Sequence, residues 1–89
     1  MNARLLTALP VYNEVSHVAS VLTELLQHVD DVLVVDDGST DGTAEILQQF
    51  PQVHVERHSP NRGYGGALRT AFEYAQRYGY DILVTMDCD

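Results

Sequence analysis

The sequence predicts an α/β protein built on a parallel sheet, and three observations lead there. Short apolar segments alternate with segments whose apolar residues recur every three or four positions, as strands alternate with amphipathic helices. Residues 32–35 are apolar throughout, which is typical of a strand covered on both faces. Polar and glycine-rich segments follow the strands. The resulting order, β-α-β-α-β-α-β, favours right-handed crossovers between parallel strands.

Two strands and one helix are expected in the first part of the chain. Residues 5–9 form an apolar run closed by Pro10, which predicts a buried strand, and residues 32–35 form the second strand. Between them, helical spacing joins a set of apolar residues, namely Val15, Val18, Leu22, Leu25, Leu26 and Val29. Residues 36–43 are rich in Asp, Gly, Ser and Thr and predict a loop.

Two helices and two strands are expected in the rest. A short helix is expected to begin after Asp41, its candidate N-cap, and to end before Pro51. The residues expected to face the core are Ala44, Leu47 and Phe50. Residues 53–55 alternate apolar and polar, so they predict an edge strand that is wet on one side. The third helix ends at Gly79, and its apolar stripe is Leu68, Ala71, Phe72 and Ala75. Residues 82–86 form the fourth strand.

The simplest arrangement of these elements is a Rossmann-like three-layer α/β/α fold. Its parallel sheet has about four strands in the order 3-2-1-4, which places the alternating third strand at an edge.

Composition excludes several classes of protein. At 89 residues the chain is one domain at most, or part of one. A net charge of −8 argues against nucleic-acid binding, and the absence of lysine excludes a P-loop and a Schiff-base lysine. The single cysteine excludes an internal disulfide. With no signal peptide or membrane-spanning run, the expected location is the cytoplasm.

The chemistry of the chain gathers at one rim of the predicted sheet. Ligands of open parallel sheets bind at the carboxyl ends of the strands. The four segments that follow the strands are 10–14, 36–43, 61–67 and 87–89, and they hold the unusual polar residues. The opposite rim carries only ordinary solvated turns.

This rim is acidic, which predicts a divalent cation. Its carboxylates are Glu14, Asp36, Asp37, Asp41, Asp87 and Asp89, with Arg62 the nearby cation in the sequence. Such a cluster repels itself unless a positive charge joins it. Asp87 and Asp89, one residue apart at a strand end, present hard oxygens to Mg²⁺ or Mn²⁺, which then completes its shell with water and substrate phosphates.

The other loops suit the rest of a nucleotide. Asp37 is expected to accept hydrogen bonds from a base or ribose, and Tyr12 to lie against a base, with Pro10 fixing its approach. Glycines at positions 63, 65 and 66 let the backbone approach a ligand, with amides at a helix N-terminus where anions are favoured.

Each feature alone also has a purely structural interpretation. An isolated Asp-x-Asp is weak, and residues 36–43 fit an Asx turn with a helix cap. The tyrosines at 64, 74, 78 and 80 are interpreted as packing or surface residues, and the histidines at 17, 28, 54 and 58 as surface residues. Cys88 is interpreted as a small spacer. The conjunction of four such loops on one rim favours the functional interpretation.

Taken in order, P-V-Y-N-E, V-V-D-D-G-S-T-D-G-T, N-R-G-Y-G-G-A and M-D-C-D resemble the N-terminal half of a family 2 glycosyltransferase of the GT-A fold. The resemblance extends over residues 5–89, and N-R-G-Y-G-G-A looks most like the polyprenyl-phosphate branch, typified by dolichol-phosphate mannose synthase.

The resemblance implies a role for each matching position. Pro10, Tyr12 and Glu14 would contact the nucleoside, and Val35 and Asp37 would line the base pocket. Asp87, Cys88 and Asp89 would form the D-x-D element, with Asp89 a direct ligand of the metal. The metal would stabilise the departing nucleotide diphosphate while an acceptor oxygen attacks the anomeric carbon with inversion.

The resemblance also bounds what this chain contains. Residues 1–89 would be the nucleotide-sugar-binding half, without the acceptor half and without a catalytic base. The donor would be GDP-mannose or, less favoured, a UDP-sugar. The acceptor of the full-length parent would be a lipid phosphate at the cytoplasmic membrane face, and the isolated chain would bind nucleotide without transferring sugar.

Two other classes of function stay open. One is a non-catalytic assembly or regulatory module made from a shortened transferase, since the exposed edge of the fourth strand predicts a homo-oligomer. The other is a receiver-like signalling domain, which also clusters aspartates at strand ends but needs a lysine that this chain lacks.

Overall fold

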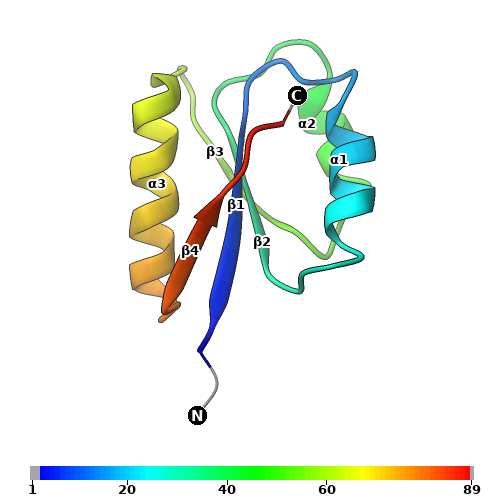
Figure 1. Cartoon of the computed structure of the whole chain (residues 1–89). Coiled ribbons are helices and arrows are strands. Elements are labelled where there is room, and N and C mark those ends of the chain that lie inside the picture. Colours follow the sequence, from blue (N-terminus) through cyan, green and yellow to red (C-terminus); the bar gives the residue numbers. More distant parts are fainter. Residues whose placement is uncertain (1–2, 89) are drawn as a thin grey trace.

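The computed structural model describes residues 3–88, and its seven elements follow the predicted order (Figure 1). The strands are β1 (Leu5–Val11), β2 (Val32–Asp36), β3 (His54–Arg57) and β4 (Ile82–Thr85). The helices are α1 (Val18–Leu25), α2 (Thr43–Leu47) and α3 (Gly63–Arg77). All strand pairs are parallel, in the order β3-β2-β1-β4, which confirms the predicted topology.

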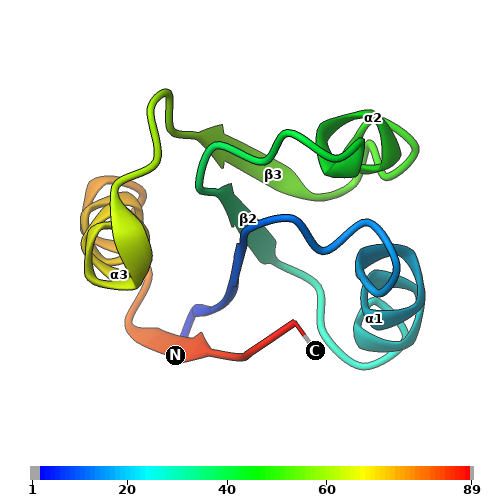
Figure 2. The same ribbon diagram turned by 90° about the horizontal axis from the view of Figure 1, so that it is seen from above.

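Three layers are visible from above, with α1 and α2 on one face of the sheet and α3 on the other (Figure 2). Successive strand residues point to opposite faces, so both faces of the central strands are covered. Leu9 and Val34 pack in the cluster with α1 and α2, whereas Leu33 and Val35 pack in the cluster under α3. Burying each such side chain stabilises the fold by about 1.5–3 kcal/mol.

Helix α3 packs on the sheet through alanines. Ala67, Ala71 and Ala75 are buried at spacings of four, and their small side chains let the helix lie close to β1 and β2. The prediction that Phe72 belongs to this stripe is wrong, because its side chain is 56% exposed. Residue 72 lies about 100° around the helix from Ala71 and therefore faces away from the sheet.

Two helix boundaries differ from the predictions. The N-cap of α2 is Gly42, at φ 100°, so the prediction of Asp41 is wrong by one residue. Asp41 still accepts a hydrogen bond from the Thr43 amide, at 3.0 Å. Helix α1 begins at Val18, after the exposed Val15. Within the described part of the chain, none of the helices has the length and apolarity needed to cross a membrane.

Strand β3 lies at an edge of the sheet, as its alternating pattern predicts. All four of its residues are exposed, so the prediction that one face of this strand is buried is wrong for the residues of the strand. Val53, just before the strand, is the residue that packs into the core. The opposite edge is β4, which ends at Thr85, one residue earlier than predicted.

Candidate functional site

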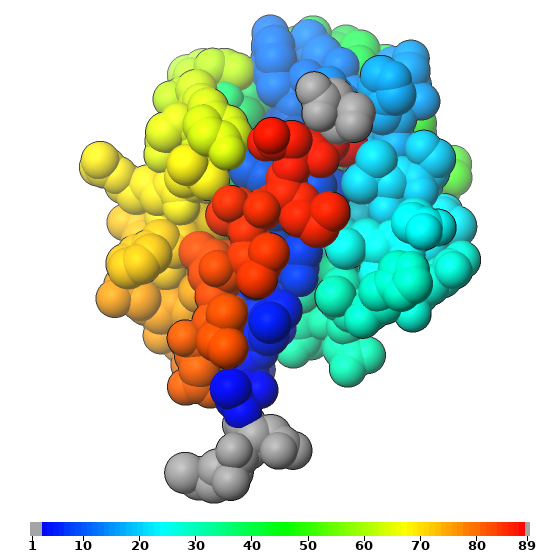
Figure 3. All heavy atoms as spheres, viewed as in Figure 1, coloured from blue at the N-terminus to red at the C-terminus, as the bar shows by residue number. Residues whose placement is uncertain are grey.

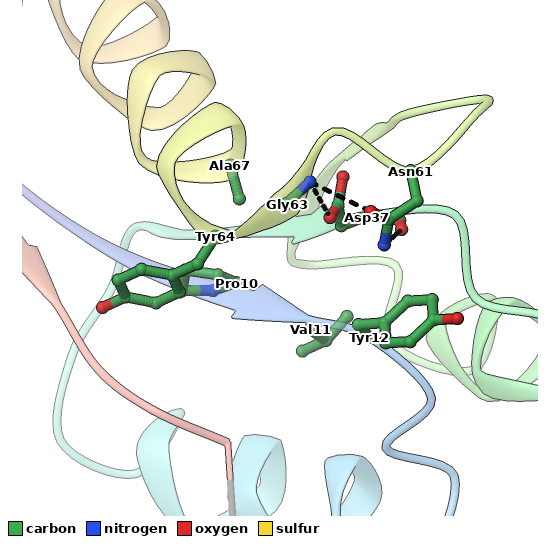
Figure 4. A pocket seen from close by; sticks show the side chains of 8 residues that line it. All are labelled: Pro10, Val11, Tyr12, Asp37, Asn61, Gly63, Tyr64 and Ala67. Atoms are coloured by element: carbon green, nitrogen blue, oxygen red, sulfur yellow. Dashed lines mark hydrogen bonds between the residues drawn. The ribbon is translucent and has the colours of Figure 1, made fainter.

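Two cavities open at the carboxyl ends of the strands, and these strand ends lie at the top of Figure 1. The first, here called the Asp37 cavity, measures about 280 Å³ and is lined by Pro10, Val11, Tyr12, Asp37, Asn61, Gly63, Tyr64 and Ala67 (Figure 4). The second, the Asp87 cavity, measures about 230 Å³ and is lined by Pro10, Tyr12, Glu14, Tyr64, Asp87 and Cys88. Pro10, Tyr12 and Tyr64 line both, so the two cavities adjoin at these residues, and together they are called the groove below.

The aromatic rings of this groove come from two different elements. Tyr12 directly follows β1 and is 51% exposed, and Tyr64 lies in the first turn of α3 and is 57% exposed. Figure 4 shows Tyr64 beside Pro10 and Tyr12 beyond Val11. Two half-exposed aromatic rings at one groove are positioned to contact a flat or apolar ligand group.

Asp37 holds the start of α3. Its Oδ1 accepts hydrogen bonds from the Arg62 amide (2.8 Å) and from His58 Nδ1 (2.7 Å), and its Oδ2 accepts one from the Gly63 amide (2.8 Å). Its backbone carbonyl accepts one from Asn61 Nδ2, at 2.9 Å. The loop before α3, which forms one wall of the Asp37 cavity, is therefore attached to this single residue.

These contacts lower the pKa of Asp37. Burial by itself raises the pKa of the carboxyl, but hydrogen bonds from the Arg62 amide, His58 and the Gly63 amide outweigh burial and lower it below its ordinary value of 3.8. The carboxylate thus binds two amides at the start of α3, those of Arg62 and Gly63. The expectation that the Gly63 amide faces an anionic ligand is wrong, because that amide is already bound to Asp37.

The remaining polar residues of the 36–43 loop attach it to the loop after β1. Ser39 Oγ accepts a hydrogen bond from the Asn13 amide (2.9 Å), and Thr43 Oγ1 accepts one from the Glu14 amide (3.1 Å). Asp41 accepts one from the Val15 amide, at 3.2 Å. Ser39, Asp41 and Thr43 therefore have a structural role in this segment, because their side chains bind backbone amides of the loop after β1.

Arg57 neutralises Asp36, which corrects one part of the charge argument. The Asp36 carboxylate is buried, and its Oδ2 lies 2.8 Å from the Arg57 guanidinium. Its Oδ1 accepts a hydrogen bond from the Ser39 amide. Asp36 is thus bound within the protein, and Asp37 lines the Asp37 cavity with its carboxylate held by three hydrogen bonds. Among the described residues, the carboxylates that line the Asp87 cavity are Glu14 and Asp87. The acidic cluster is smaller than the sequence indicates.

The other predicted site residues have different surroundings. The Val35 side chain is fully buried under α3 and lies behind the cavity wall, not on its surface. Cys88 lines the Asp87 cavity but is 4% exposed and packs in the core cluster with α1. Asp87 is exposed on this cavity. Asp89, the predicted direct metal ligand, lies outside the described residues.

The donor set of the Asp87 cavity fits a hard cation that takes most of its ligands from elsewhere. Between residues 3 and 88, no group of three or more His, Cys, Asp or Glu side chains is arranged to hold a metal ion. Glu14 and Asp87 contribute hard carboxylate oxygens. Glu14 Oε2 is buried, accepts no hydrogen bond within the described structure, and lies 3.4 Å from His17 Nδ1. Mg²⁺ is commonly bound by one or two carboxylates together with waters and phosphates.

Two residues of the site were missed by sequence reasoning. Tyr64, interpreted as a packing or surface residue, lines both cavities. His58, interpreted as a surface residue, is 3% exposed and bound to Asp37. Each of them carried a signal in the sequence. Tyr64 is an aromatic residue flanked by glycines, and His58 follows β3 directly, as Asp37 follows β2.

A four-stranded parallel sheet in this order, with its ligand groove at the strand ends, is consistent with the first part of the Rossmann-like GT-A class of fold. The family model for glycosyl transferase family 2 matches residues 7–89. The chain belongs to this family, which confirms the resemblance and makes it a glycosyltransferase by family.

Three curated relatives illustrate the branch. Undecaprenyl-phosphate mannosyltransferase from Micrococcus luteus is 41% identical over 97% of this chain and 38% of its own length. UDP-N-acetylglucosamine--dolichyl-phosphate N-acetylglucosaminyltransferase from Methanococcus voltae is 33% identical over 91% of this chain and 39% of its own. Polyprenol monophosphomannose synthase from Mycolicibacterium smegmatis is 34% identical over 97% and 35%. The chain thus spans less than two fifths of the length of these relatives.

Proposed function

We propose that this chain is the nucleotide-binding part of a glycosyltransferase that moves a sugar from a nucleotide diphosphate to a polyprenyl phosphate. The observation that supports this most is that the Asp37 and Asp87 cavities adjoin at the strand ends and share Pro10, Tyr12 and Tyr64. Tyr12 and Tyr64 line both cavities. Asn61 and the hydrogen-bonded Asp37 are added at one end, and Glu14 and Asp87 at the other. A ligand with a flat group at one end and a metal-bound anion at the other matches both ends.

The nucleoside occupies the Asp37 cavity in this proposal. Its base lies against Tyr12, with Pro10 between the two cavities and Glu14 next to the sugar–phosphate end. Asp37 retains room for one further hydrogen bond at Oδ2, since a carboxylate oxygen accepts two and Oδ2 accepts one within the described structure. Val35 supports the cavity wall from behind and makes no direct side-chain contact with the base.

The diphosphate lies in the Asp87 cavity, where Asp87, Cys88 and Asp89 form the D-x-D element. Family 2 enzymes are generally dependent on a divalent metal, and Asp87 and Asp89 would hold Mg²⁺ or Mn²⁺ here. The bound ion supplies Lewis-acid stabilisation of the departing nucleotide diphosphate. In the full reaction an acceptor phosphate oxygen would form the new bond to the anomeric carbon as the bond from that carbon to the nucleotide diphosphate breaks, with inversion. In this proposal the described residues contribute donor binding, and the chain by itself binds nucleotide without transferring sugar.

The donor favoured by this proposal is GDP-mannose, with a UDP-sugar as the alternative. Two of the three relatives above are named for mannosyl transfer and one for UDP-N-acetylglucosamine. All three names contain a polyprenyl, undecaprenyl or dolichyl group, which supports a lipid-phosphate acceptor.

Calorimetric titration of GDP and of UDP into the chain, with and without Mn²⁺, tests this function. We expect measurable binding of one nucleotide in the presence of Mn²⁺, and a preference for GDP would support the mannosyl donor. If the folded chain binds neither nucleotide, the proposal that it forms a donor site is wrong.

Tyr64→Ala is expected to weaken nucleotide binding about 5- to 10-fold. Tyr64 lines both cavities, so its ring is expected to contact the nucleotide beside Tyr12. Losing one aromatic contact with a base costs about 1–3 kcal/mol, and 1.4 kcal/mol corresponds to about tenfold in affinity. The measurement is the same titration. Tyr78→Ala is the matched control, because Tyr78 is also half-exposed but lies at the opposite end of α3. Equal affinities of wild type and Tyr64→Ala would exclude Tyr64 from the nucleotide site.

A second candidate function, assembly, is supported by the β4 surface. In Figure 3, β4 and the segment after it lie across the visible face, between α3 and α1. β4 is an edge strand, and Ile82 and Val84 of β4, Met86 just after it and Leu5 of β1 are 39–45% exposed. Exposed apolar edges pair with other chains. We therefore propose that isolated chains associate through β4.

Sedimentation equilibrium tests this assembly. Wild type is expected to form dimers or larger species at high protein concentration, and Val84→Lys to shift the population toward monomer, since a lysine on an edge strand opposes strand pairing. Thr23→Lys, on the exposed side of α1, is the control. A folded wild-type monomer at high concentration would contradict the proposal.

A further inference from the structure

His58 is a buried histidine whose two ring nitrogens are both bound. It follows β3 directly and is 3% exposed. Its Nδ1 lies 2.7 Å from Asp37 Oδ1, and its Nε2 lies 2.7 Å from Thr70 Oγ1. Its backbone amide donates to the Asp36 carbonyl at 2.9 Å. The ring therefore joins three separate segments, namely the end of β2, the end of β3 and the second turn of α3.

Hydrogen-bond chemistry determines which nitrogen carries the proton. The Asp37 carboxylate only accepts hydrogen bonds, so Nδ1 of His58 is the donor in this pair. In the neutral imidazole Nε2 is then an acceptor, and the Thr70 hydroxyl donates to it. This tautomer leaves no free polar atom on the ring and fixes its orientation at both ends.

The carboxylate that His58 holds is the one that supports the Asp37 cavity. Asp37 binds the amides of Arg62 and Gly63, and its carbonyl binds the Asn61 side chain. Asn61 and Gly63 in turn line the cavity. A rotation of the Asp37 carboxylate would release both amides at once, and the His58 ring opposes that rotation from the buried side.

We propose that His58 is a positioning residue for nucleotide binding, acting through Asp37 on the 61–63 segment that forms one wall of the Asp37 cavity. This inference rests on the proposed function, because it assigns the cavity to a nucleoside. His58 lines neither cavity of the groove, so it acts without touching the ligand. Its contribution is to keep the wall in its bound position before the ligand arrives, which lowers the ordering cost of binding.

Gly38 places an independent constraint on the same wall. It has φ 82°, and a Cβ added there would lie 3.0 Å from the Asn61 amide nitrogen. The loop after β2 therefore touches the 61–63 segment directly, which leaves little room for that segment to shift toward β2. Movement away from β2 is opposed by the hydrogen bonds of Asp37, and thus by His58.

Three variants separate positioning from general stability. His58→Ala removes both ring contacts. His58→Asn keeps a donor near the position of Nδ1 and loses the bond to Thr70. His54→Ala is the control, because His54 is an exposed histidine of β3 that lies outside the groove. Each variant is titrated with GDP and Mn²⁺ at a temperature where it is fully folded, and hydrogen exchange of the Arg62 and Gly63 amides is measured without nucleotide.

We expect His58→Ala to bind GDP about 10-fold more weakly and to lose protection of the Gly63 amide about 10-fold, with protection of β2 amides unchanged. His58→Asn is expected to bind GDP within about 3-fold of wild type, because it keeps a donor for Asp37 near the position of Nδ1. A role in stability alone would lower protection throughout the sheet and leave the affinity of the folded fraction unaltered.

The possible results separate the positioning role of His58 from the proposed function of nucleotide binding. If wild type binds GDP and folded His58→Ala binds equally well, the positioning role is wrong and the proposed function stands. If wild type binds neither GDP nor UDP, the proposed function fails, and the amide exchange still decides whether His58 holds the 61–63 segment. Should His58→Ala not fold, a His58→Asn variant with wild-type affinity and protection supports the inference, and one with neither property overturns it.

Discussion

Asp37→Ala is expected to lower the free energy of unfolding by about 3 kcal/mol. The substitution leaves the Arg62 amide, the Gly63 amide and His58 Nδ1 without their acceptor. A hydrogen bond to a charged group contributes about 1.5–3 kcal/mol, and water replaces part of it at the exposed Arg62. A loss of this size is a large share of the about 5–15 kcal/mol that stabilises a typical domain.

Urea unfolding of wild type and variant measures this difference. Asp30→Ala, an exposed acidic residue in the α1–β2 connection, is the control and is expected to change stability by less than about 0.5 kcal/mol. A loss below about 1 kcal/mol in Asp37→Ala would mean that the amides find other partners and that Asp37 does not organise the start of α3.

The contribution of Asp37 should also depend on pH in a defined direction. Its pKa in the folded state lies below the ordinary value of 3.8, so folding favours the ionised form. The stability advantage of wild type over Asp37→Asn is therefore fully present above about pH 4 and decreases as the pH falls through the folded-state pKa. Unfolding measured at a series of acidic pH values tests this, and an advantage that grows on acidification would contradict it.

This structural role changes how Asp37 variants bear on nucleotide binding. Loss of binding in Asp37→Ala would not demonstrate a contact between Asp37 and a base, because the same change releases the wall that includes Asn61 and Gly63. Tyr64, which is exposed and makes no hydrogen bond to this wall in the described structure, gives the cleaner test of contact.

Mn²⁺ is expected to raise the affinity of the chain for GDP about 30-fold, and Asp89→Asn is expected to abolish this increase. The Asp87 cavity presents Glu14 and Asp87 to any ligand, in a chain whose net charge is −8. A diphosphate is repelled there unless a cation lies between the two anions. About 30-fold corresponds to roughly 2 kcal/mol.

Calorimetry with Mn²⁺ and with excess EDTA measures the metal dependence. Asp87→Asn should reduce it, Asp89→Asn should remove it, and Asp30→Asn should leave it unaltered because that residue is distant from the groove. If GDP binds equally well in EDTA, the metal proposal is wrong while nucleotide binding itself stands. If both aspartate variants keep a full Mn²⁺ effect, the ion is held by other groups.

The fold was predictable because its signals are local. Residues 32–35 carry no polar side chain, and the structure covers both faces of β2. Helical spacing located α1, and the order of strands and helices led to the parallel sheet. The predictions failed where a shift of one residue changes the answer. The N-cap of α2 is Gly42 and not Asp41, and Phe72 lies next to the buried Ala71 but on the exposed side of α3.

By itself, the sequence determined the family, the sheet order and the rim on which the polar loops gather, because these follow from periodicity and from short contiguous motifs. Only the tertiary structure decided which carboxylates are free. Arg57 reaches Asp36 from 21 positions away, and His58 reaches Asp37 from the same separation. Such pairs form because parallel neighbours β2 and β3 end side by side, and no local pattern encodes the partner of a side chain across a sheet.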